Sequence, residues 1–337
     1  MATAQYTFQD FKSDQEVRWC PGCGDIGVLN AVQKAMAELG RKKEDFVVVS
    51  GIGCSSRFPY YMNTYGFHGI HGRAGVLASG VKSANPNLSV WQVTGDGDAL
   101  AIGGNHFIHE IRRNIDLNIV LLNNQIYGLT KGQYSPTSLM GQVTKTSPYG
   151  TIEDPFKPGE LTIGARGKFF ARTLDTKLKE TTDVMIEAEK FRGTSVVEVL
   201  QNCVIFNDGC FKHITSKENR DDAQLWLEHG KPMLFGQNNE KGLVMDGFQL
   251  KVVKIGENGI TADDILVHDA HCESSYLHMA LIEMEAPAFP VAFGVIRAVS
   301  APTYDAMTEE QIRNVQAKTN IKCMDDLLFS GEIWEVK

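Results

Sequence analysis

Short apolar segments alternate with helical segments along the chain, and this alternation limits the possible folds more than any other feature. The apolar segments have the length of strands buried on both faces, and the helical segments repeat apolar residues at helical spacing. The predicted strands are residues 46–49, 90–94, 117–122 and 195–200, and the predicted helices are residues 25–39, 72–84 and 99–113. This order predicts an α/β fold, with a doubly wound, mostly parallel sheet between two layers of helices.

The chain has two parts of different pattern. We expect residues 1–224 to form the main domain, and residues 225–337 to form a C-terminal extension packed on it. The extension contains a predicted helix at residues 274–285 and an apolar segment at residues 290–295. Residues 135–159 hold four prolines among many Ser, Thr and Gly residues, which predicts a long ordered loop over a site.

Composition excludes several classes of protein. The 337 residues carry 41 acidic and 33 basic side chains, and a net charge of −8 argues against nucleic acid or an anionic membrane as partner. We see neither an apolar run of membrane-spanning length nor a secretory signal, so we expect a cytoplasmic protein. Seven cysteines in such a chain favour metal ligation or buried thiols over a disulfide framework.

Chemically active side chains follow four of the predicted strands, each at the point where the strand ends. Cys54, Asp96, Asn124 and Cys203 come after the first, second, third and fourth strands, respectively. Ligands of open α/β sheets bind outside the carboxyl ends of the strands. We therefore expect these four residues to meet at one edge of the sheet.

The segment Gly95-Asp96-Gly97 is followed, after about 25 residues, by Asn123-Asn124. Asp96 and Asn124 can supply the oxygen ligands that Mg²⁺ prefers, and the glycines let the backbone approach a phosphate. Asp98 would lie at the start of the next helix, as a cap or as a second acceptor. Because a helix and a strand separate the two segments, they predict a magnesium diphosphate site rather than two unrelated turns.

The cysteines suggest a second centre. Cys20 and Cys23 precede a helix whose dipole would favour their thiolates, and Cys54 adds a third thiol. A redox dithiol, half of a zinc site and two inert thiols remain alternatives, but a [4Fe–4S] cluster with four thiolates is favoured. Cys203 is the predicted fourth ligand because it follows a strand directly, and Cys210 is the alternative.

The Gly-Asp-Gly and Asn-Asn segments together resemble the thiamine-diphosphate-binding motif. The combined pattern is similar to the β subunit of 2-oxoacid:ferredoxin oxidoreductases over nearly the whole chain. The segments that carry this resemblance are Trp19-Cys20-Pro21-Gly22-Cys23-Gly24, Gly51-Ile52-Gly53-Cys54-Ser55-Ser56, His71-Gly72-Arg73-Ala74, Thr94-Gly95-Asp96-Gly97-Asp98, Tyr127-Gly128-Leu129-Thr130-Lys131-Gly132-Gln133, Gly294-Val295-Ile296-Arg297 and Pro302-Thr303-Tyr304-Asp305. One departure is Asn202, which stands before Cys203 where the family usually has proline.

The resemblance implies a thiamine-diphosphate-binding fold and a set of cofactor contacts. Magnesium would be held by Asp96, Asn124 and the backbone carbonyl of Ile126, and the cluster by Cys20, Cys23, Cys54 and Cys203. The implied cofactor-binding residues are Ile52, Gly53, Cys54, Ser55, His71, Gly95, Asp96, Gly97, Asp98, Asn124, Gly128, Leu129 and Thr130.

The resemblance also implies a reaction. This is the oxidative decarboxylation of 2-oxoglutarate with coenzyme A to succinyl-CoA and CO₂, in principle reversible, with electrons leaving singly through the cluster to ferredoxin. A subunit acting on pyruvate or on many 2-oxoacids is one alternative. A non-oxidative thiamine-dependent lyase with a structural metal site and a non-catalytic electron-transfer module are others.

A second subunit is expected. Thiamine enzymes activate the coenzyme with a carboxylate from a pyrimidine-binding domain, and the sequence indicates only one α/β domain with the diphosphate motif. An α subunit would supply that glutamate, in a dimer of heterodimers, so no catalytic residue is assigned to this chain.

Two further residues have competing interpretations. His71 would contact the diphosphate or the substrate, or would cap the helix that follows it. Arg57 lies three residues after Cys54, and arginine binds carboxylates in a bidentate manner. We predict that Arg57 pairs with the distal carboxylate of 2-oxoglutarate, the alternative being a solvated side chain or an interface contact.

Overall fold

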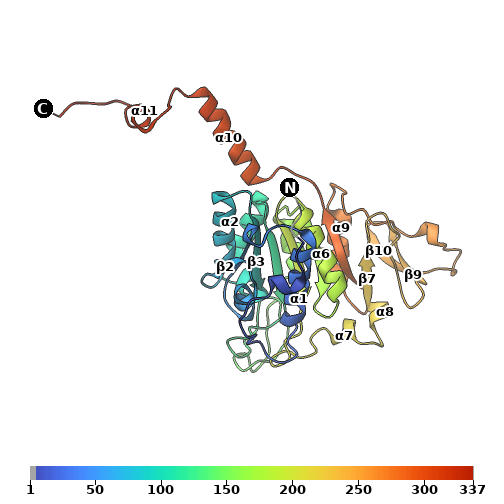
Figure 1. Ribbon diagram of the computed structural model, residues 1–337. Helices are drawn as coiled ribbons and strands as arrows, with labels where there is room; N and C mark the ends of the chain where they lie inside the picture. The colour runs from blue at the N-terminus through green and yellow to red at the C-terminus, as the bar shows by residue number, and fades with distance from the viewer. Residues whose placement is uncertain (1–4, 337) are drawn as a thin grey trace.

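The computed structural model describes residues 5–336 and places helices on both sides of a twisted central sheet (Figure 1). The strands of this sheet are β1 Phe46–Ser50, β2 Tyr65–His68, β3 Ser89–Gly95, β4 Asn118–Asn123, β5 Phe169–Leu174, β6 Ser195–Leu200, β7 Gln224–Leu227 and β11 Val291–Ala298. A separate antiparallel sheet contains β8 Leu234–Phe235, β9 Lys241–Asp246 and β10 Gln249–Lys254.

Most of the helices lie between these strands in the sequence, whereas the first precedes them and the last two follow them. The helices are α1 Asp25–Leu39, α2 Ala74–Ala84, α3 Asp96–Leu100, α4 Gly104–Arg113, α5 Pro158–Gly164, α6 Leu178–Lys190, α7 Lys212–Thr215, α8 Arg220–Ala223, α9 Tyr276–Glu283, α10 Tyr304–Lys318 and α11 Met324–Leu328. Short 3₁₀ helices are η1 Phe8–Phe11, η2 Lys43–Asp45, η3 Cys54–Tyr61 and η4 Ala262–Asp264.

The main sheet has the strand order β2-β1-β3-β4-β6-β5-β11-β7. The first six of these strands are parallel, whereas β11 pairs antiparallel with β5 and parallel with β7. The expectation of a mostly parallel α/β sheet is therefore confirmed. Strands on both sides of residue 224 belong to this sheet, and the division of the chain there stays a prediction.

Side chains that alternate along a strand pack into two separate cores, one on each face of the sheet. Phe46 and Val48 of β1 pack with α1 and α6, whereas Val47 and Val49 pack with α2 and α4 on the other face. Full burial of one such aliphatic side chain stabilises the fold by about 1.5–3 kcal/mol. A sheet that is covered on both faces needs apolar side chains at successive positions of its strands, which explains the continuous apolar runs seen in the sequence.

The predicted helix over residues 99–113 is wrong in one respect. The structure has two helices here, α3 and α4, because the backbone leaves the helical region at Ala101 with ψ −105°. A Cβ at Gly103 would lie 2.4 Å from the Asp98 carbonyl oxygen, so glycine permits the close approach at this break. Consequently α3 is a short turn of helix that begins at Asp96 itself.

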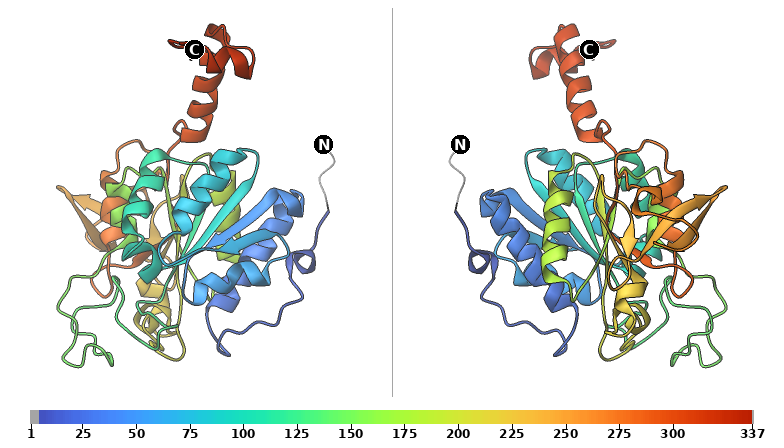
Figure 2. Two further views of the ribbon diagram at one scale, coloured as in Figure 1. Left: turned by 90° about the vertical axis from the view of Figure 1, so that its left-hand side faces the viewer. Right: turned by 90° about the vertical axis from the view of Figure 1, so that its right-hand side faces the viewer.

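The segment from Tyr304 to Val336 stands apart from the sheet as an arm, seen clearly in both views of Figure 2. It starts at the end of the chain's last strand and comprises α10, α11 and an extended tail. Several large apolar side chains on it are exposed, among them Val315, Leu328 and Trp334. Within residues 5–336, no helix is both long and apolar enough to cross a membrane.

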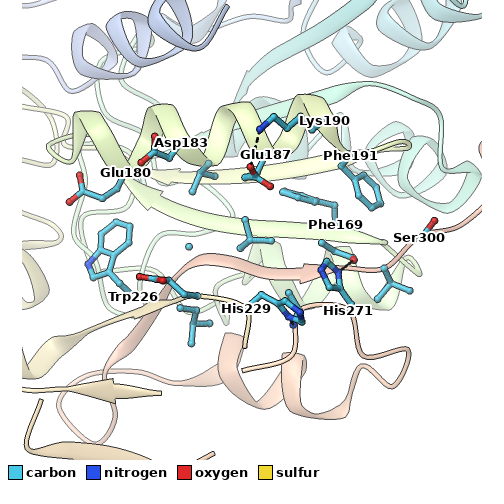
Figure 3. A pocket seen from close by; sticks show the side chains of 18 of the residues that line it. Phe169, Glu180, Asp183, Glu187, Lys190, Phe191, Trp226, His229, His271 and Ser300 are labelled. Carbon is cyan, nitrogen blue, oxygen red and sulfur yellow. Dashed lines mark hydrogen bonds and ion pairs between the residues drawn. The ribbon is translucent and has the colours of Figure 1, made fainter. Parts of the chain in front are cut away.

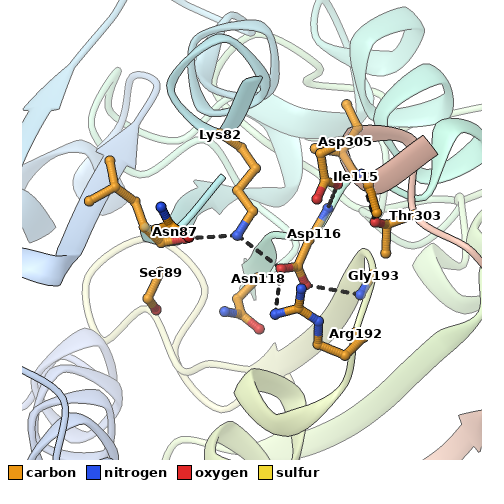
Figure 4. Close-up of polar contacts among 12 residues, drawn as sticks. Lys82, Asn87, Ser89, Ile115, Asp116, Asn118, Arg192, Gly193, Thr303 and Asp305 are labelled. Carbon is orange, nitrogen blue, oxygen red and sulfur yellow. Dashed lines mark hydrogen bonds and ion pairs between the residues drawn. The ribbon is translucent and has the colours of Figure 1, made fainter. Parts of the chain in front are cut away.

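A buried ion pair joins the loops at the amino ends of β4 and β6 to the start of the arm (Figure 4). Lys82 Nζ lies 2.9 Å from Asp116 Oδ2 and donates to the Leu88 carbonyl, while Arg192 approaches the same carboxylate at 3.3 Å. The Asp116 backbone N–H donates to Asp305 Oδ1 at 3.0 Å. These contacts close the edge of the sheet opposite to the one predicted to bind ligands.

Glu110, on α4, is buried beneath α2 without a cationic partner. Its Oε1 accepts a hydrogen bond from Gln92 Nε2 at 3.2 Å, and Oε2 lacks a partner among the described residues. Burial raises the pKa of Glu110 to about 8, which the hydrogen bond from Gln92 only partly opposes. A Cβ at Gly75 would lie 2.2 Å from Oε2, so only glycine fits above this carboxyl group.

We expect Glu110→Gln to change how stability depends on pH. The native state keeps a proton that the unfolded state, with a pKa of 4.5, releases, so the free energy of unfolding falls as pH rises from about 4.5 to about 8. The variant should match the wild type near pH 5 and exceed it by on the order of a few kcal/mol at pH 8. Urea unfolding at both pH values measures this, with the exposed Glu310→Gln as control. An unchanged pH dependence in Glu110→Gln would contradict it.

Candidate active site

A cavity lies at the carboxyl edge of the sheet, where the loops after β1, β3 and β4 meet. Its volume is about 90 Å³. The residues that line it are Asp25, Ile52, Gly53, Cys54, Ser55, His71, Gly95, Asp96, Gly97, Asp98, Leu122, Asn124, Ile126, Tyr127, Gly128, Leu129 and Thr130. Every residue implied as a thiamine or magnesium contact is in this set, so the structure brings those positions together.

Asp96 is held in place by two hydroxyl groups from the long loop. Ser135 Oγ and Thr137 Oγ1 each donate to Asp96 Oδ2 at 2.5 Å. Burial raises the pKa of Asp96 to about 6, although both hydroxyls lower it in part. The proline-rich loop was expected over the site, but its two hydroxyl residues were not identified, because nothing local in the sequence links them to Asp96.

Asn124 has both ends of its side-chain amide engaged. Its Nδ2 donates to Gln201 Oε1 at 2.8 Å, and its Oδ1 accepts from the Ile126 backbone N–H at 3.2 Å. Its backbone carbonyl accepts from Asn207 Nδ2 at 2.9 Å. The amide oxygen therefore lies on the side of Ile126, another residue that lines the cavity.

The buried carboxylate of Asp98 ties together three loops around the cavity. It accepts hydrogen bonds from the backbone N–H groups of Ile52 at 3.1 Å and Gly72 at 2.8 Å, and from Thr94 Oγ1 at 2.9 Å. His71 Nδ1 lies 2.5 Å from Asp98 Oδ1. The structure therefore does not support a capping role for His71, because α2 begins with no side-chain cap and the imidazole bonds to Asp98 instead.

The ring of Tyr127 closes the cavity above the Gly-Asp-Gly segment. Its hydroxyl donates to the Gly97 carbonyl at 2.7 Å, and a Cβ at Gly97 would lie 2.3 Å from the ring. Burial and the neighbouring charges of Asp96 and Asp98 raise the pKa of Tyr127 to about 12. The Tyr127 ring thus leaves no room for a side chain at Gly97.

The cysteines gather beside the cavity. A Cβ at Gly128 would lie 3.4 Å from Cys203 Sγ and 3.8 Å from Cys54 Sγ, so these two thiols flank the same backbone. Cys23 interacts electrostatically with both, and Cys20, which is exposed, with Cys54. Cys210 lies beside Asn124, with its Sγ 3.9 Å from that residue's carbonyl oxygen, and it too interacts electrostatically with Cys203.

Burial raises the pKa of two of these thiols, Cys23 and Cys54. The pKa of Cys23 is raised well above its ordinary value, first by burial and then by the charge of Asp25, and this outweighs the hydrogen bond from the Asp25 backbone N–H. Burial and Asp25 also raise the pKa of Cys54 to about 12. Desolvation is thus the larger effect on these two thiols without a bound metal, and the expectation that the start of α1 favours thiolates stays a prediction.

Asp25 is a residue of this site that sequence reasoning missed. It is 1% exposed and lines the cavity, and neither carboxylate oxygen accepts a well-formed hydrogen bond within the described residues. Burial raises the pKa of Asp25 to about 7, opposed in part by the Cys23 thiol. The sequence feature that could have indicated Asp25 is an acidic residue on the buried face of α1, two residues after Cys23.

Asn202 stands where the family that the sequence resembles usually has proline. Both ends of its side-chain amide form hydrogen bonds. Its Nδ2 donates to Asp208 Oδ1 and its Oδ1 accepts from the Gly209 backbone N–H, both at 2.8 Å. These bonds close the loop that carries Cys203. The asparagine therefore restrains the loop by hydrogen bonds, where a proline would restrain it through its fixed φ.

Arg57 lies outside the cavity, on η3. It is exposed, and it is close enough to Cys54 to lower that thiol's pKa slightly. The structure thus places its guanidinium near the cysteines but not among the residues that line the cavity. Its proposed contact with substrate stays a prediction.

A much wider groove lies elsewhere. It has a volume of about 1110 Å³ and runs between α6 and the strands β7 and β11, with Trp226, His229 and His271 along one side and acidic residues of α6 along the other (Figure 3). None of the predicted site residues lines it. It lies where α6 extends from β5 and β6 toward β11.

Comparison with known proteins identifies the family. Residues 51–199 match the thiamine pyrophosphate enzyme, C-terminal TPP binding domain. The chain is 47% identical to the 2-oxoglutarate oxidoreductase subunit KorB of Mycobacterium tuberculosis, over 97% of this chain and 88% of that protein. The chain belongs to the β-subunit family of 2-oxoacid:ferredoxin oxidoreductases.

Other members of this oxidoreductase family are also similar to the chain. The 2-oxoglutarate synthase subunit KorB of Archaeoglobus fulgidus is 41% identical over 70% of this chain and 89% of its own length. A solved 2-oxoglutarate:ferredoxin oxidoreductase from Magnetococcus marinus, with 2-oxoglutarate, coenzyme A and succinyl-CoA bound, is 31% identical, has a TM-score of 0.76 and covers 97% of each chain. The resemblance and the thiamine-binding fold inferred from the sequence are confirmed, and this β subunit implies an α subunit.

We expect Gly97→Ala to lower the free energy of unfolding and Gly80→Ala to raise it. The added methyl group at Gly97 meets the Tyr127 ring, and overpacking of this kind costs about 1–3 kcal/mol. Gly80, inside α2, has open space, and alanine there should add about 0.5–1 kcal/mol of stability. Urea unfolding of both variants measures the difference, and equal midpoints would show that the tyrosine does not enforce the glycine.

Proposed function

We propose that this chain is the β subunit of a 2-oxoglutarate:ferredoxin oxidoreductase acting in the cytoplasm. The reaction converts 2-oxoglutarate, coenzyme A and two oxidised ferredoxins into succinyl-CoA, CO₂, two reduced ferredoxins and a proton. The observation that carries this proposal is the 47% identity to a 2-oxoglutarate oxidoreductase subunit along nearly the whole chain. Relatives named for 2-oxoacids in general favour a broad substrate range as the second candidate.

The oxygen donors around the cavity fit magnesium and a diphosphate. The Asp96 carboxylate, the Asn124 amide oxygen and the Ile126 carbonyl are hard donors of the kind that magnesium binds. Ser55 Oγ lines the same cavity, is buried and lacks a partner among the described residues, so it is available to donate to a phosphate oxygen. When bound, thiamine diphosphate supplies the electron sink for loss of CO₂.

The thiols fit a cluster better than a single ion. Within residues 5–336, no three His, Cys, Asp or Glu side chains are spaced to hold one metal ion, which is the arrangement that zinc requires. In a [4Fe–4S] cluster, each cysteine binds a different iron, so its ligands stand further apart. We assign Cys20, Cys23, Cys54 and Cys203 as these ligands, since Cys203 shares the Gly128 backbone with Cys54.

The cavity is too small to enclose a whole coenzyme. Ligand pockets commonly measure about 300–1,000 Å³, and this one measures about 90 Å³. Leu129 on its wall and Ile102 and Ile70 near its rim are exposed apolar residues, as expected of a surface that a partner covers. We assign the α subunit as that partner, completing the site in a dimer of heterodimers.

Anaerobic assay of the co-purified α and β subunits tests the proposal. With coenzyme A and ferredoxin, 2-oxoglutarate should be oxidised faster than pyruvate, and the β chain alone should be inactive. Asp96→Ala should lose activity in the complex and retain iron, whereas Cys54→Ser should lose iron. Wild-type complex that neither contains iron nor binds thiamine diphosphate would refute the function.

We expect Arg57→Ala to change substrate selectivity. If the guanidinium pairs with the distal carboxylate of 2-oxoglutarate, its removal should raise KM for 2-oxoglutarate at least tenfold and leave KM for pyruvate nearly unchanged, because an ion pair with hydrogen bonds is lost for one substrate only. Arg112→Ala, at an exposed position of α4, is the control. Equal effects on the two substrates would exclude this role for Arg57.

A further inference from the structure

Gln201 connects the cysteine region to the oxygen ligands of the cavity. It follows β6 directly and is 1% exposed. Its Nε2 lies 3.4 Å from Cys23 Sγ, and its Oε1 accepts from Asn124 Nδ2 at 2.8 Å. One side-chain amide therefore contacts a predicted cluster ligand at one end and a predicted magnesium ligand at the other.

The surrounding groups permit only one orientation of this amide. Nε2 also donates to the Asn202 carbonyl at 2.7 Å, an acceptor that would repel an oxygen in the same place. Oε1 must then face Asn124, and it can only accept there. Asn124 consequently presents its NH₂ group to Gln201 and its oxygen to the side of Ile126 and the cavity. A metal can bind that oxygen but not the NH₂ group.

Packing holds Gln201 in this position. A Cβ at Gly24 would lie 2.8 Å from Gln201 Cγ and 1.9 Å from Asp175 Oδ2, so glycine at this point of the cysteine segment makes room for both side chains. The Gln201 backbone N–H donates to the Asn123 carbonyl at 2.9 Å, which continues the pairing of β4 with β6. The residue is thus restrained at its backbone, its stem and both ends of its amide.

We propose that Gln201 is a positioning residue for both cofactors, an inference that rests on the function proposed above. It orients the Asn124 oxygen toward magnesium, and it donates an N–H···S hydrogen bond to the Cys23 ligand of the cluster. Hydrogen bonds to cluster sulfur raise the reduction potential, because they stabilise the more negative, reduced form. The same amide thus sets the affinity of one centre and the potential of the other.

Gln201→Met tests both parts, since methionine keeps the length of the side chain and removes both polar ends. In the co-purified complex, the cluster's midpoint potential, measured by redox titration with electron paramagnetic resonance, should fall. The dissociation constant for thiamine diphosphate with magnesium, measured by quenching of protein fluorescence, should rise about tenfold. Neither measurement requires turnover.

Gln201→Glu separates the two parts. Protonated against the Asn202 carbonyl, which would repel a carboxylate oxygen, the new side chain still accepts from Asn124 but has no donor left for Cys23. The potential should therefore fall, while the affinity for thiamine diphosphate stays within about twofold of wild type. Gln33→Leu is the matched control, because Gln33 is equally buried and its Nε2 donates to the Phe11 and Tyr61 carbonyls, away from both centres. It should lower stability without moving the potential or the affinity.

The outcomes separate the inference from the function on which it rests. A wild-type complex that contains iron and binds thiamine diphosphate, with Gln201→Met unchanged in either property, overturns the proposal and leaves the function standing. A wild-type complex without iron or coenzyme binding refutes the function itself. If Gln201→Met does not fold, Gln201→Glu decides: its potential must fall, and wild-type values would overturn the proposal.

Discussion

The geometry of the cavity depends on the hydrogen bonds accepted by one buried carboxylate, that of Asp98. It binds the loop after β1 through Ile52, the approach to α2 through Gly72 and His71, and the end of β3 through Thr94. A Cβ at Gly51 would lie 1.8 Å from this carboxylate, so the glycines of the motif exist partly to let it approach. Loops from three parts of the sequence are thereby held at fixed spacing before any ligand arrives.

The charge balance of the site favours cations. Within the described part of the chain, the residues that line the cavity include three buried aspartates and no lysine or arginine, and buried thiols lie beside them. Burial raises the pKa of Asp25, Asp96 and Cys54, and for Cys54 the nearby Arg57 opposes this only slightly. Metal ions would supply positive charge, and their binding would release protons from these groups. This balance of charge supports the proposal that the cavity holds a metal ion.

The sequence predicted the sheet and the residues that follow its strands because both depend on local pattern. Asp96 and Asn124 could be placed together, since parallel strands end at one edge. Ser135, which holds Asp96, could not, because it reaches the site through a loop whose path no periodicity records. Gln201, which holds Asn124, follows β6 directly, but nothing local in the sequence links its side chain to Asn124. The break between α3 and α4 was missed for a similar reason, since helical spacing continues across Ala101 and tertiary contact ends the helix there.

The exposed arm has a consequence for handling the protein. Its bulky apolar side chains, Trp334 and Leu328 among them, are in contact with water in the isolated chain, and any assembly that buries them is held together largely by the hydrophobic effect. That force weakens on cooling. Complexes that rely on this arm should therefore dissociate more readily at low temperature than at room temperature, although proteins are commonly purified in the cold to keep complexes intact.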